Sequence, residues 1–257
     1  MVDGENKKII KTLLREGHSV KQIDNVAVEE PLQILINNKN YAVLMRTPGR
    51  DIELVAGFLA AEGIVDAKDE IEGIGLCTSP NTVRVSLCAG TVWRPRELPV
   101  SSSCGICGLD SIESLNEQLS QQRISTEIEL STKQLFLGLD LLRAHQKNYE
   151  VTAGCHGAGL FNPSTNTLLD WAEDIGRHNA VDKIMGKLLL ADDYPVCETF
   201  VLLLSGRISF EIVQKAARGQ VAAICAVGMP TSLAIEAAEA TGIKLYGWAR
   251  NNQVSSY

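Results

Sequence analysis

The chain has 257 residues, 45% of them hydrophobic and 21% charged, which suits one large or two unequal globular domains with a real core. Its net charge of −7 at pH 7 argues against broad binding to nucleic acid or to an anionic membrane surface. No segment reaches the roughly 18 apolar residues of a membrane span, and the start, MVDGENKKII, lacks the apolar core of a secretory signal.

The cysteines indicate a reducing compartment. There are seven, an odd number, and only Cys104 and Cys107 lie close together in the sequence. In a chain of this length, that spacing is typical of free thiols and not of a disulfide framework. We therefore expect a cytoplasmic protein.

Residues 1–20 form a polar, charged lead-in. Their apolar residues fall at a spacing that favours a short helix. These residues are Ile9, Ile10, Leu13 and Leu14.

Residues 21–99 predict a small β-rich domain with one helix. Apolar segments at 32–36 and 41–45 flank an asparagine-rich turn and predict a hairpin. Apolar residues at helical spacing predict a helix at 52–64. Two further strands are expected at 71–76 and 82–87.

Residues 100–108, VSSSCGICG, predict a flexible loop between two structural units. Serine, glycine and cysteine give this segment little that can anchor a core. Beyond it, residues 109–257 predict a second domain in which helices alternate with apolar strands, an order typical of a largely parallel sheet covered on both faces. Helices are expected at 131–145, with Ser131 as its cap, and at 174–190, 208–218 and 232–241, and strands at 199–204, 222–227 and 243–248.

The pair Cys104 and Cys107 is the feature with the clearest chemistry. A C-x-x-C spacing brings two thiols close together, which serves redox exchange, half of a zinc site, or relay of sulfur on a thiol. A structural zinc site needs a second closely spaced ligand pair, and the sequence has none. The redox interpretation needs the start of a helix after a strand, whereas an exposed loop with small neighbours suits a sulfur relay. Two unremarkable loop cysteines remain the alternative.

Polar residues directly follow two predicted strands of the second domain. Ser205, Gly206 and Arg207 come after the strand at 199–204, and Thr231 opens the helix after the next strand. Helix starts bind anions, and open α/β sheets place ligands beyond the carboxyl ends of their strands. A ligand site and an ordinary helix cap at Thr231 are both open at this point.

Two histidines stand beside charged or flexible neighbours. If residues 174–182 are helical, Asp174, His178 and Asp182 share one face. The histidine could then be a base, a ligand contact or a paired surface residue. His156 lies in the glycine-rich run TAGCHG, where a ligand contact and a loop residue without a role are equally open.

Several blocks of sequence resemble those of the FdhD family of formate dehydrogenase accessory proteins. The blocks occur in order over most of the chain, and SSSCGICG is one of them. They lie at residues 29–38, 45–65, 101–108, 152–161, 173–186, 205–219 and 229–250.

This resemblance implies a fold and an activity. The fold is a cytidine-deaminase-like three-layer α/β/α domain at 109–257, combined with the smaller β-rich α+β domain. The activity is sulfur transfer: a cysteine desulfurase would load a persulfide, which passes to the molybdenum cofactor destined for formate dehydrogenase. That cofactor is bis-molybdopterin guanine dinucleotide (bis-MGD), and the family usually forms a homodimer. No metal-ligating residues of this chain's own are implied, and the H-x-E and P-C-x-x-C signature of zinc deaminases is absent from the sequence.

The resemblance also assigns residues. Cys104 matches the persulfide-bearing cysteine and Cys107 the second cysteine of the motif. A cofactor stretch corresponds to the C-terminal strand and tail. The cofactor pocket would then be lined by Arg177, His178, Ser205, Gly206, Arg207 and Thr231, with the stretch Trp248, Ala249, Arg250, Asn251, Asn252 and Gln253. The main alternative is a chaperone that holds the cofactor without carrying sulfur, and a weaker one is a zinc- or redox-linked regulator.

Overall fold

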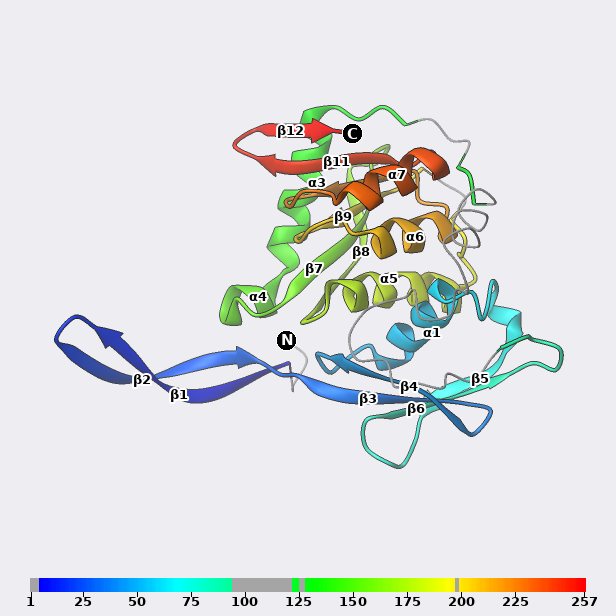
Figure 1. The fold of residues 1–257 in the computed structure, drawn as a ribbon, viewed down its shortest axis with the longest axis horizontal. Helices are drawn as coiled ribbons and strands as arrows, with labels where there is room; N and C mark the ends of the chain where they lie inside the picture. The colour runs from blue at the N-terminus through cyan, green and yellow to red at the C-terminus, as the bar shows by residue number, and fades with distance from the viewer. Residues whose placement is uncertain (1–4, 94–121, 125–127, 197–198) are drawn as a thin grey trace.

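The structure, a computed structural model, describes residues 5–93, 122–124, 128–196 and 199–257. It is a mixed α/β protein with a β-rich N-terminal region and a larger C-terminal region built on a mixed sheet (Figure 1). The predicted loop at 100–108, with Cys104 and Cys107, lies outside the described residues. No helix in the described ranges is long and apolar enough to cross a membrane.

The β-rich region is a four-stranded sheet with one helix on its inner face. The strand order is β4-β3-β6-β5, with β3 and β6 parallel and the other pairs antiparallel. Alternate residues of β3, such as Leu32 and Ile34, are fully buried against α1, as a strand with one covered face requires. The elements are β3 (Glu30–Ile36), β4 (Lys39–Arg46), α1 (Asp51–Ala61), η1 (Lys68–Glu70), β5 (Ile71–Leu76) and β6 (Thr82–Leu87).

The C-terminal region is a six-stranded sheet in the order β12-β11-β10-β9-β7-β8. Strands β9, β10 and β11 are parallel, whereas β7, β8 and β12 each run antiparallel to a neighbour. The elements are α3 (Thr132–His145), α4 (Lys147–Thr152), β7 (His156–Asn162), β8 (Thr167–Asp174), α5 (Arg177–Ala191), β9 (Val201–Leu204), α6 (Phe210–Arg218), β10 (Ala223–Ala226), α7 (Ser232–Thr241), β11 (Lys244–Arg250) and β12 (Gln253–Ser256).

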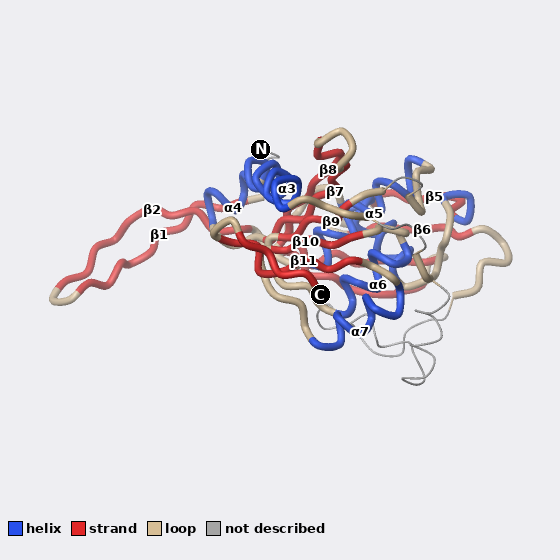
Figure 2. Tube along the Cα trace, turned by 90° about the horizontal axis from the view of Figure 1, so that it is seen from above, coloured by secondary structure: helices blue, strands red, loops and turns tan. Residues whose placement is uncertain are grey.

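Helices cover both faces of this sheet, which makes three layers (Figure 2). Along β9, Leu202 and Leu204 pack into the cluster formed with α5, α6 and α7. Their neighbours Val201 and Leu203 point to the opposite cluster, which α3 completes. The continuous apolar strands of this region are therefore buried on two sides.

Most predicted elements are confirmed, and their ends follow local chemistry. The hairpin of β3 and β4, the strands β5 and β6, and the helices α1, α3, α6 and α7 all lie where the sequence predicts them. Ser131 caps α3 as expected: its hydroxyl accepts a hydrogen bond from Gln134 N, and the Gln134 side chain accepts one from Ser131 N.

The short helix expected within residues 1–20 is wrong. The chain instead forms a two-stranded ribbon of β1 (Asn6–Arg15) and β2 (His18–Ala27), which crosses the boundary expected at residue 20. Arg15 pairs with His18, so the turn is two residues long, and Gly17 supplies the positive φ of 79° that such a turn needs.

The expectations of a largely parallel sheet and of a helix starting at 174 are also corrected. The antiparallel hairpin of β7 and β8 was not predicted, and Asp174 is the last residue of β8, so it shares no helix face with His178 and Asp182. Asp174 Oδ1 accepts a hydrogen bond from Gly176 N at 2.9 Å, which ends the strand and turns the chain into α5.

The two regions are joined by a close crossing of α1 and α5. A Cβ atom on Gly57 would lie 1.9 Å from the carbonyl oxygen of Asp182, and one on Gly186 would lie 1.8 Å from that of Glu53. Both approaches are to backbone, so no side-chain movement can relieve them. The two helices touch because neither position carries a side chain.

We predict that Gly57→Ala strongly destabilises the protein. Alanine favours an isolated helix over glycine by about 1 kcal/mol, but overpacking costs about 1–3 kcal/mol or more, so the free energy of unfolding in urea should fall. The control is Gly73→Ala, because nothing lies within 4 Å of a Cβ atom there. Equal stability of the two variants would contradict the close crossing.

Candidate functional site

The strand ends of the larger sheet gather polar residues at one edge. Strands β9, β10 and β11 are parallel, so their carboxyl ends meet there. Strand β7 begins and β8 ends at this edge, because His156 pairs with Asp174 and β7 runs antiparallel to β9. Helices α5, α6 and α7 therefore all start along this edge (Figure 1). We refer to it as the carboxyl edge.

Glycines let the loops at the carboxyl edge lie directly against each other. Gly228 N donates to Gly206 O, and Trp248 N donates to Gly228 O, both at 3.0 Å. A Cβ atom on Gly228 would lie 2.6 Å from Gly206 O, and one on Gly247 would lie 2.8 Å from Pro230 Cδ. The backbone at this edge is thus closely packed, and side chains larger than glycine would not fit at Gly228 or Gly247.

Two arginines and a histidine surround Gly206. A Cβ atom on Gly206 would lie 3.3 Å from His156 Nδ1 and 3.8 Å from Arg177 Cδ, and Arg207 follows directly in sequence. Neither Arg177 nor Arg207 forms a hydrogen bond or ion pair with the described residues, and Arg177 Nε is buried without a partner among them. The edge therefore presents guanidinium groups that are free to bind an anion.

The electrostatics of this cluster are positive. Burial lowers the pKa of Arg177, and the neighbouring charge of Arg207 lowers it further. Burial also lowers the pKa of His156 below 6.5, and the charge of Arg177 acts in the same direction. Burial is the larger cause of both shifts, and repulsion between like charges is the second; Glu211 and Asp174 act in the opposite direction on Arg177 and His156.

Two of the three helix starts carry no side-chain cap. Gly176 at α5 has no side chain to cap the helix, and the Ser209 side chain at α6 makes no capping hydrogen bond. Thr231 Oγ1, at α7, accepts one from Ala234 N at 3.3 Å. The ordinary interpretation of Thr231 as a helix cap is therefore confirmed. At the start of α6, Ile212 N donates to Ser209 O and the Glu211 carboxylate lies against its own N–H, so the start of α5 is the one that adds to the anion-binding character of the edge.

His178 is buried beside the start of α6. Its Nε2 lies 3.0 Å from Ser209 Oγ and 3.6 Å from Glu211 Oε2. The hydrogen bond with His178 lowers the pKa of Glu211 to about 2. These contacts fix the start of α5 against the start of α6, so His178 has a structural role at the carboxyl edge.

Exposed apolar side chains flank the same edge. Val227 and Met229 stand on either side of Gly228 and are 40% and 45% exposed. Trp248, whose N bonds to Gly228, is 42% exposed, and Leu233 in the first turn of α7 is 43% exposed. A ligand with a charged part and a flat apolar part would find both kinds of surface here.

A buried polar network anchors this edge to the β-rich region. Asp174 is fully buried, and its Oδ2 accepts from Lys183 Nζ at 2.8 Å and from Thr47 N at 3.2 Å. Its Oδ1 accepts from Asn179 Nδ2 at 2.9 Å. Thr47 Oγ1 accepts from Ile175 N and lies 3.7 Å from Cys155 Sγ, beside His156. The loop after β4 thus helps position both His156 and Arg177.

The remaining predicted residues lie at varied places. The hydroxyl of Ser205 accepts a bond from Gly157 N at 2.8 Å and ties β9 to β7. Ala249 is buried on the α3 face, so its side chain points away from the edge. The guanidinium of Arg250 lies 3.0 Å above the centre of the Trp248 ring. Asn251 and Asn252 form the turn before Gln253, each with a positive φ.

The two buried cysteines that the structure describes, Cys155 and Cys225, are poorly suited to act as nucleophiles. Burial raises the pKa of Cys155 to about 11 and that of Cys225 to about 12. Both thiols therefore stay protonated near neutral pH, and the thiolate is the reactive form. Within the described ranges, no three histidine, cysteine or carboxylate side chains gather as a metal site would require.

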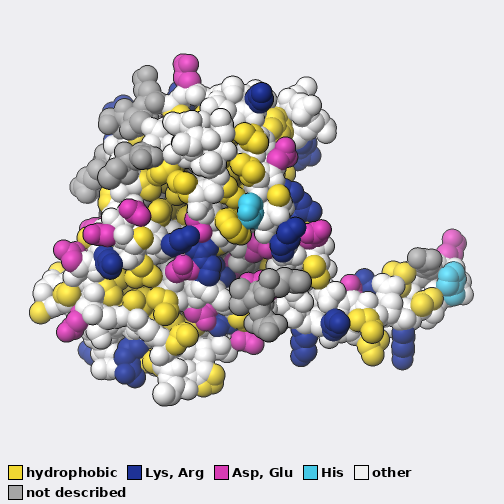
Figure 3. All heavy atoms as spheres, turned by 180° about the vertical axis from the view of Figure 1, so that it is seen from behind, with side chains coloured by type: hydrophobic (Ala, Val, Ile, Leu, Met, Phe, Trp, Pro, Cys, Tyr) yellow, Lys and Arg dark blue, Asp and Glu magenta, His cyan; other side chains and the backbone are white. Residues whose placement is uncertain are grey.

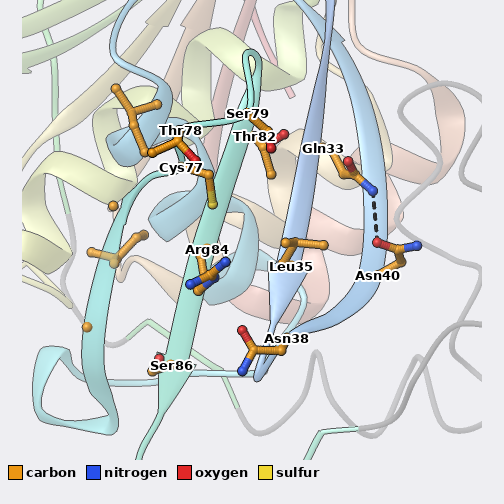
Figure 4. Close-up of a pocket in the computed structure, with 14 residues that line it drawn as sticks. Gln33, Leu35, Asn38, Asn40, Cys77, Thr78, Ser79, Thr82, Arg84 and Ser86 are labelled. Atoms are coloured by element: carbon orange, nitrogen blue, oxygen red, sulfur yellow. Dashed lines mark hydrogen bonds between the residues drawn. The ribbon is translucent and has the colours of Figure 1, made fainter.

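A separate cavity of about 700 Å³ lies on the outer face of the small sheet (Figure 4). Arg84 and Cys77 line it, and Gln33 Nε2 donates to Asn40 Oδ1 at 2.8 Å across its wall. Figure 4 shows a shallow polar surface on β3 and β6, on the opposite side of that sheet from α1. Of the predicted site residues that the structure describes, none lines this cavity.

Comparison with known proteins identifies the family. The model of the FdhD/NarQ family matches residues 27–257. The chain belongs to the FdhD/NarQ family. A protein of Sulfolobus acidocaldarius named sulfur carrier protein FdhD is 39% identical over 98% of this chain and 96% of its own, and one of the same name in Streptomyces coelicolor is 36% identical over 98% and 93%.

A solved structure shares the fold. A crystal structure described as that of a formate dehydrogenase accessory protein from Desulfotalea psychrophila aligns with a TM-score of 0.79 at 23% identity, over 98% of this chain and 96% of that one. At this identity the likeness bears on the arrangement of the chain alone.

Several residues of the site were missed by the sequence analysis. Gly228, Glu211 and Ser209 contribute to the edge, and Thr47 with Lys183 supports it from below. The strand-end rule that pointed to Arg207 applies equally to Gly228, which follows β10 in the same way.

We predict a pH-dependent role for Glu211 in stability. Its pKa in the folded protein is about 2, below the ordinary value of 4.5. The resulting stabilisation is therefore complete above about pH 4.5 and is lost as the pH falls towards 2. Urea unfolding of Glu211→Gln should show a deficit against the native chain at pH 6 that shrinks on acidification. A deficit that stays constant with pH would contradict the interaction with His178.

Proposed function

We propose that this chain is a sulfur carrier that serves the maturation of formate dehydrogenase. The observation that carries the proposal is the 36–39% identity, over 98% of this chain, to proteins named sulfur carrier protein FdhD. The sequence SSSCGICG, with Cys104 and Cys107, supplies two thiols in the setting that a relay needs.

The loading step would be attack by the thiolate of Cys104 on the outer sulfur of a cysteine desulfurase persulfide. The sulfur–sulfur bond of the donor breaks, the donor cysteine leaves as a thiolate, and a new persulfide forms on Cys104. No net oxidation or reduction occurs, because one sulfur–sulfur bond replaces another. Cys107 would assist onward transfer or protect the loaded sulfur.

The recipient of the sulfur would be bis-MGD, bound as cargo at the carboxyl edge. A dinucleotide form of the cofactor carries phosphates, and Arg177 and Arg207 offer unpaired guanidinium groups beside the open start of α5. Trp248 and Met229 would contact its flat ring systems. His178, Ser205, Gly206 and Thr231 would shape the pocket, and the turn from Arg250 to Gln253 would close one end of it.

The fold of the larger region would be of the cytidine-deaminase type. The three layers and the mixed sheet with a parallel centre support this assignment. Deamination does not follow from it, because function depends on the residues of a site and not on the fold. The partners would be a cysteine desulfurase, formate dehydrogenase and a second copy of this chain.

We predict that incubation with a cysteine desulfurase and cysteine adds the mass of one sulfur atom to the intact protein. The gain should disappear in Cys104→Ala, because the accepting thiol is missing, and persist in Cys107→Ala. Intact-protein mass spectrometry measures both. The control is Cys88→Ala, which removes a half-buried thiol of the small domain and should load normally.

The same experiment separates the two candidate functions. Absence of a sulfur adduct on the native chain, with the desulfurase shown to turn over, would favour a chaperone that holds the cofactor without carrying sulfur. Loading on Cys107 in place of Cys104 would reverse the assigned roles of the two cysteines.

We predict that Arg207→Gln weakens binding of a phosphate-bearing nucleotide roughly 10- to 100-fold, as expected for loss of one charge-assisted hydrogen bond. Guanosine diphosphate is the probe, and titration calorimetry gives the dissociation constant. Arg84→Gln is the matched control, because Arg84 is an exposed arginine on the outer face of the small sheet. Unchanged affinity in Arg207→Gln would place the nucleotide elsewhere.

A further inference from the structure

His156 is the first residue of β7, so it lies at the carboxyl edge. Its side chain is on the face of the sheet that α5 and α6 cover, because side chains alternate along a strand and Ala158 is buried in that cluster. The Nδ1 and Cε1 edge of its ring faces Gly206, where a Cβ atom would lie 3.3 Å from Nδ1 and 3.6 Å from Cε1. A ligand that contacts the backbone at Gly206 would therefore also reach this imidazole.

The imidazole of His156 forms no hydrogen bond or ion pair with the residues that the structure describes. The other three of the four histidines are placed differently. His178 is 5% exposed and has its Nε2 3.6 Å from Glu211 Oε2. His145 Nδ1 lies 2.8 Å from a backbone carbonyl oxygen, and His18 lies at the turn of the ribbon. Among the described histidines, His156 is therefore the one at the carboxyl edge whose ring nitrogens are open to a ligand.

Charged groups on three elements face His156. They are Arg177 and His178 at the start of α5, Arg207 after β9, and Asp174 at the end of β8, which pairs with His156. Burial, and then the charges of Arg177 and His178, lower the pKa of His156 below 6.5, and Arg207 acts in the same direction. Asp174 acts in the opposite direction but does not reverse the shift. The ring is therefore largely neutral at pH 7 in the free protein, and an anion at this edge would raise its pKa.

We propose that His156 takes up a proton from water when a phosphate-bearing ligand binds at the carboxyl edge, and then donates a hydrogen bond from Nδ1 to a phosphate oxygen. This inference rests on the proposed function, because it concerns the same cargo site. The imidazolium would be a third positive group beside the guanidinium groups of Arg177 and Arg207. A ligand with two diphosphate groups, such as bis-MGD, carries more negative charge than two guanidinium groups balance, so the third positive charge strengthens its binding.

The charges on the opposite face of the molecule are arranged differently. Figure 3, the view from behind, shows dark blue and magenta side chains interspersed over the body of the protein. Elsewhere in the described chain, Arg50 and Lys187 both pair with Asp170. Positive groups with acidic partners gain little from a further anion, whereas Arg177 and Arg207 form no ion pair with the described residues. We therefore expect the bound anion, and the proton that accompanies it, at the carboxyl edge.

Binding at the carboxyl edge should tighten as the pH falls. The pKa of His156 is below 6.5 in the free protein and higher in the complex, so a proton is taken up between these two values. In that window the dissociation constant falls by at most about tenfold per pH unit, because one group titrates. Above the pKa of the bound state, the affinity levels off at that supplied by Arg177 and Arg207 alone.

The test is titration calorimetry of the full-length chain with diguanosine diphosphate, two guanosines joined through a diphosphate, as the probe. The phosphates of this diester neither gain nor lose protons near neutral pH, so any proton taken up goes to the protein. The native chain should take up roughly 0.3 to 1 proton at pH 7, measured as the difference in binding heat between two buffers of different ionisation enthalpy. His156→Asn keeps a polar nitrogen near the position of Nδ1, and it should abolish the uptake and weaken binding about threefold or more at pH 6. The control is His18→Asn, at an exposed position of the ribbon, which should leave the uptake unchanged.

A second measurement uses the native chain and needs no substitution. In an NMR titration of the four imidazoles, the pKa of His156 should rise when the probe is bound, and thermal unfolding checks that both variants are folded. Binding without proton uptake, uptake that persists in folded His156→Asn, or imidazole pKa values that the probe leaves unchanged would overturn this inference and leave the cargo site standing. No binding of the probe by the native chain would overturn both the inference and the cargo site. Loading of Cys104 with sulfur is measured without nucleotide, so the role as a sulfur carrier is tested independently.

Discussion

The rest of the site depends on the hydrogen bonds made by the fully buried carboxylate of Asp174. A charge without solvent is tolerable only if its oxygens are satisfied, and here each oxygen has two donors: Lys183 and Thr47 N on one, Gly176 N and Asn179 on the other. These donors come from the loop after β4, from the residue before α5 and from the first two turns of α5. A single buried charge therefore fixes the small sheet, the end of β8 and the first residues of α5, and so it sets the place of Arg177.

The positive character of the carboxyl edge follows from that arrangement. Arg177 and Arg207 converge on Gly206, and the described carboxylates nearby are already engaged: Asp174 with Lys183, and Glu211 with His178. Burial first, and then the neighbouring positive charges, lower the pKa values of Arg177 and His156. Glu211 and Asp174 act in the opposite direction, but the net shift of both pKa values is still downward. The proposed anionic ligand would add further negative charge beside these groups.

The sequence could predict the parts of the structure whose polarity follows the usual pattern. Apolar runs flanked by turn residues located β3, β9 and β10, and the rule that ligands gather beyond strand ends located Arg207. Strand β8 escaped because its polarity is inverted: Asp170 and Asp174 point inwards, while Leu169 and Trp171 are 47% and 40% exposed. Buried acids paired with distant lysines and arginines leave no local signature, so the network around Thr47 could come only from the structure.

The cysteines of the core and those of the C-x-x-C motif differ in their suitability for sulfur transfer. Burial raises the pKa values of Cys155 and Cys225, so both thiols stay protonated near neutral pH. Attack on a persulfide donor requires the thiolate form. Cys225 lies within a core cluster and Cys155 is 4% exposed, so neither thiol is open to a bulky protein partner. A carrier that must react with one protein and deliver to another needs its reactive sulfur away from such a core. The glycine and serine residues that flank Cys104 and Cys107 predict such a segment from composition, and the proposed cargo site is the closely packed carboxyl edge.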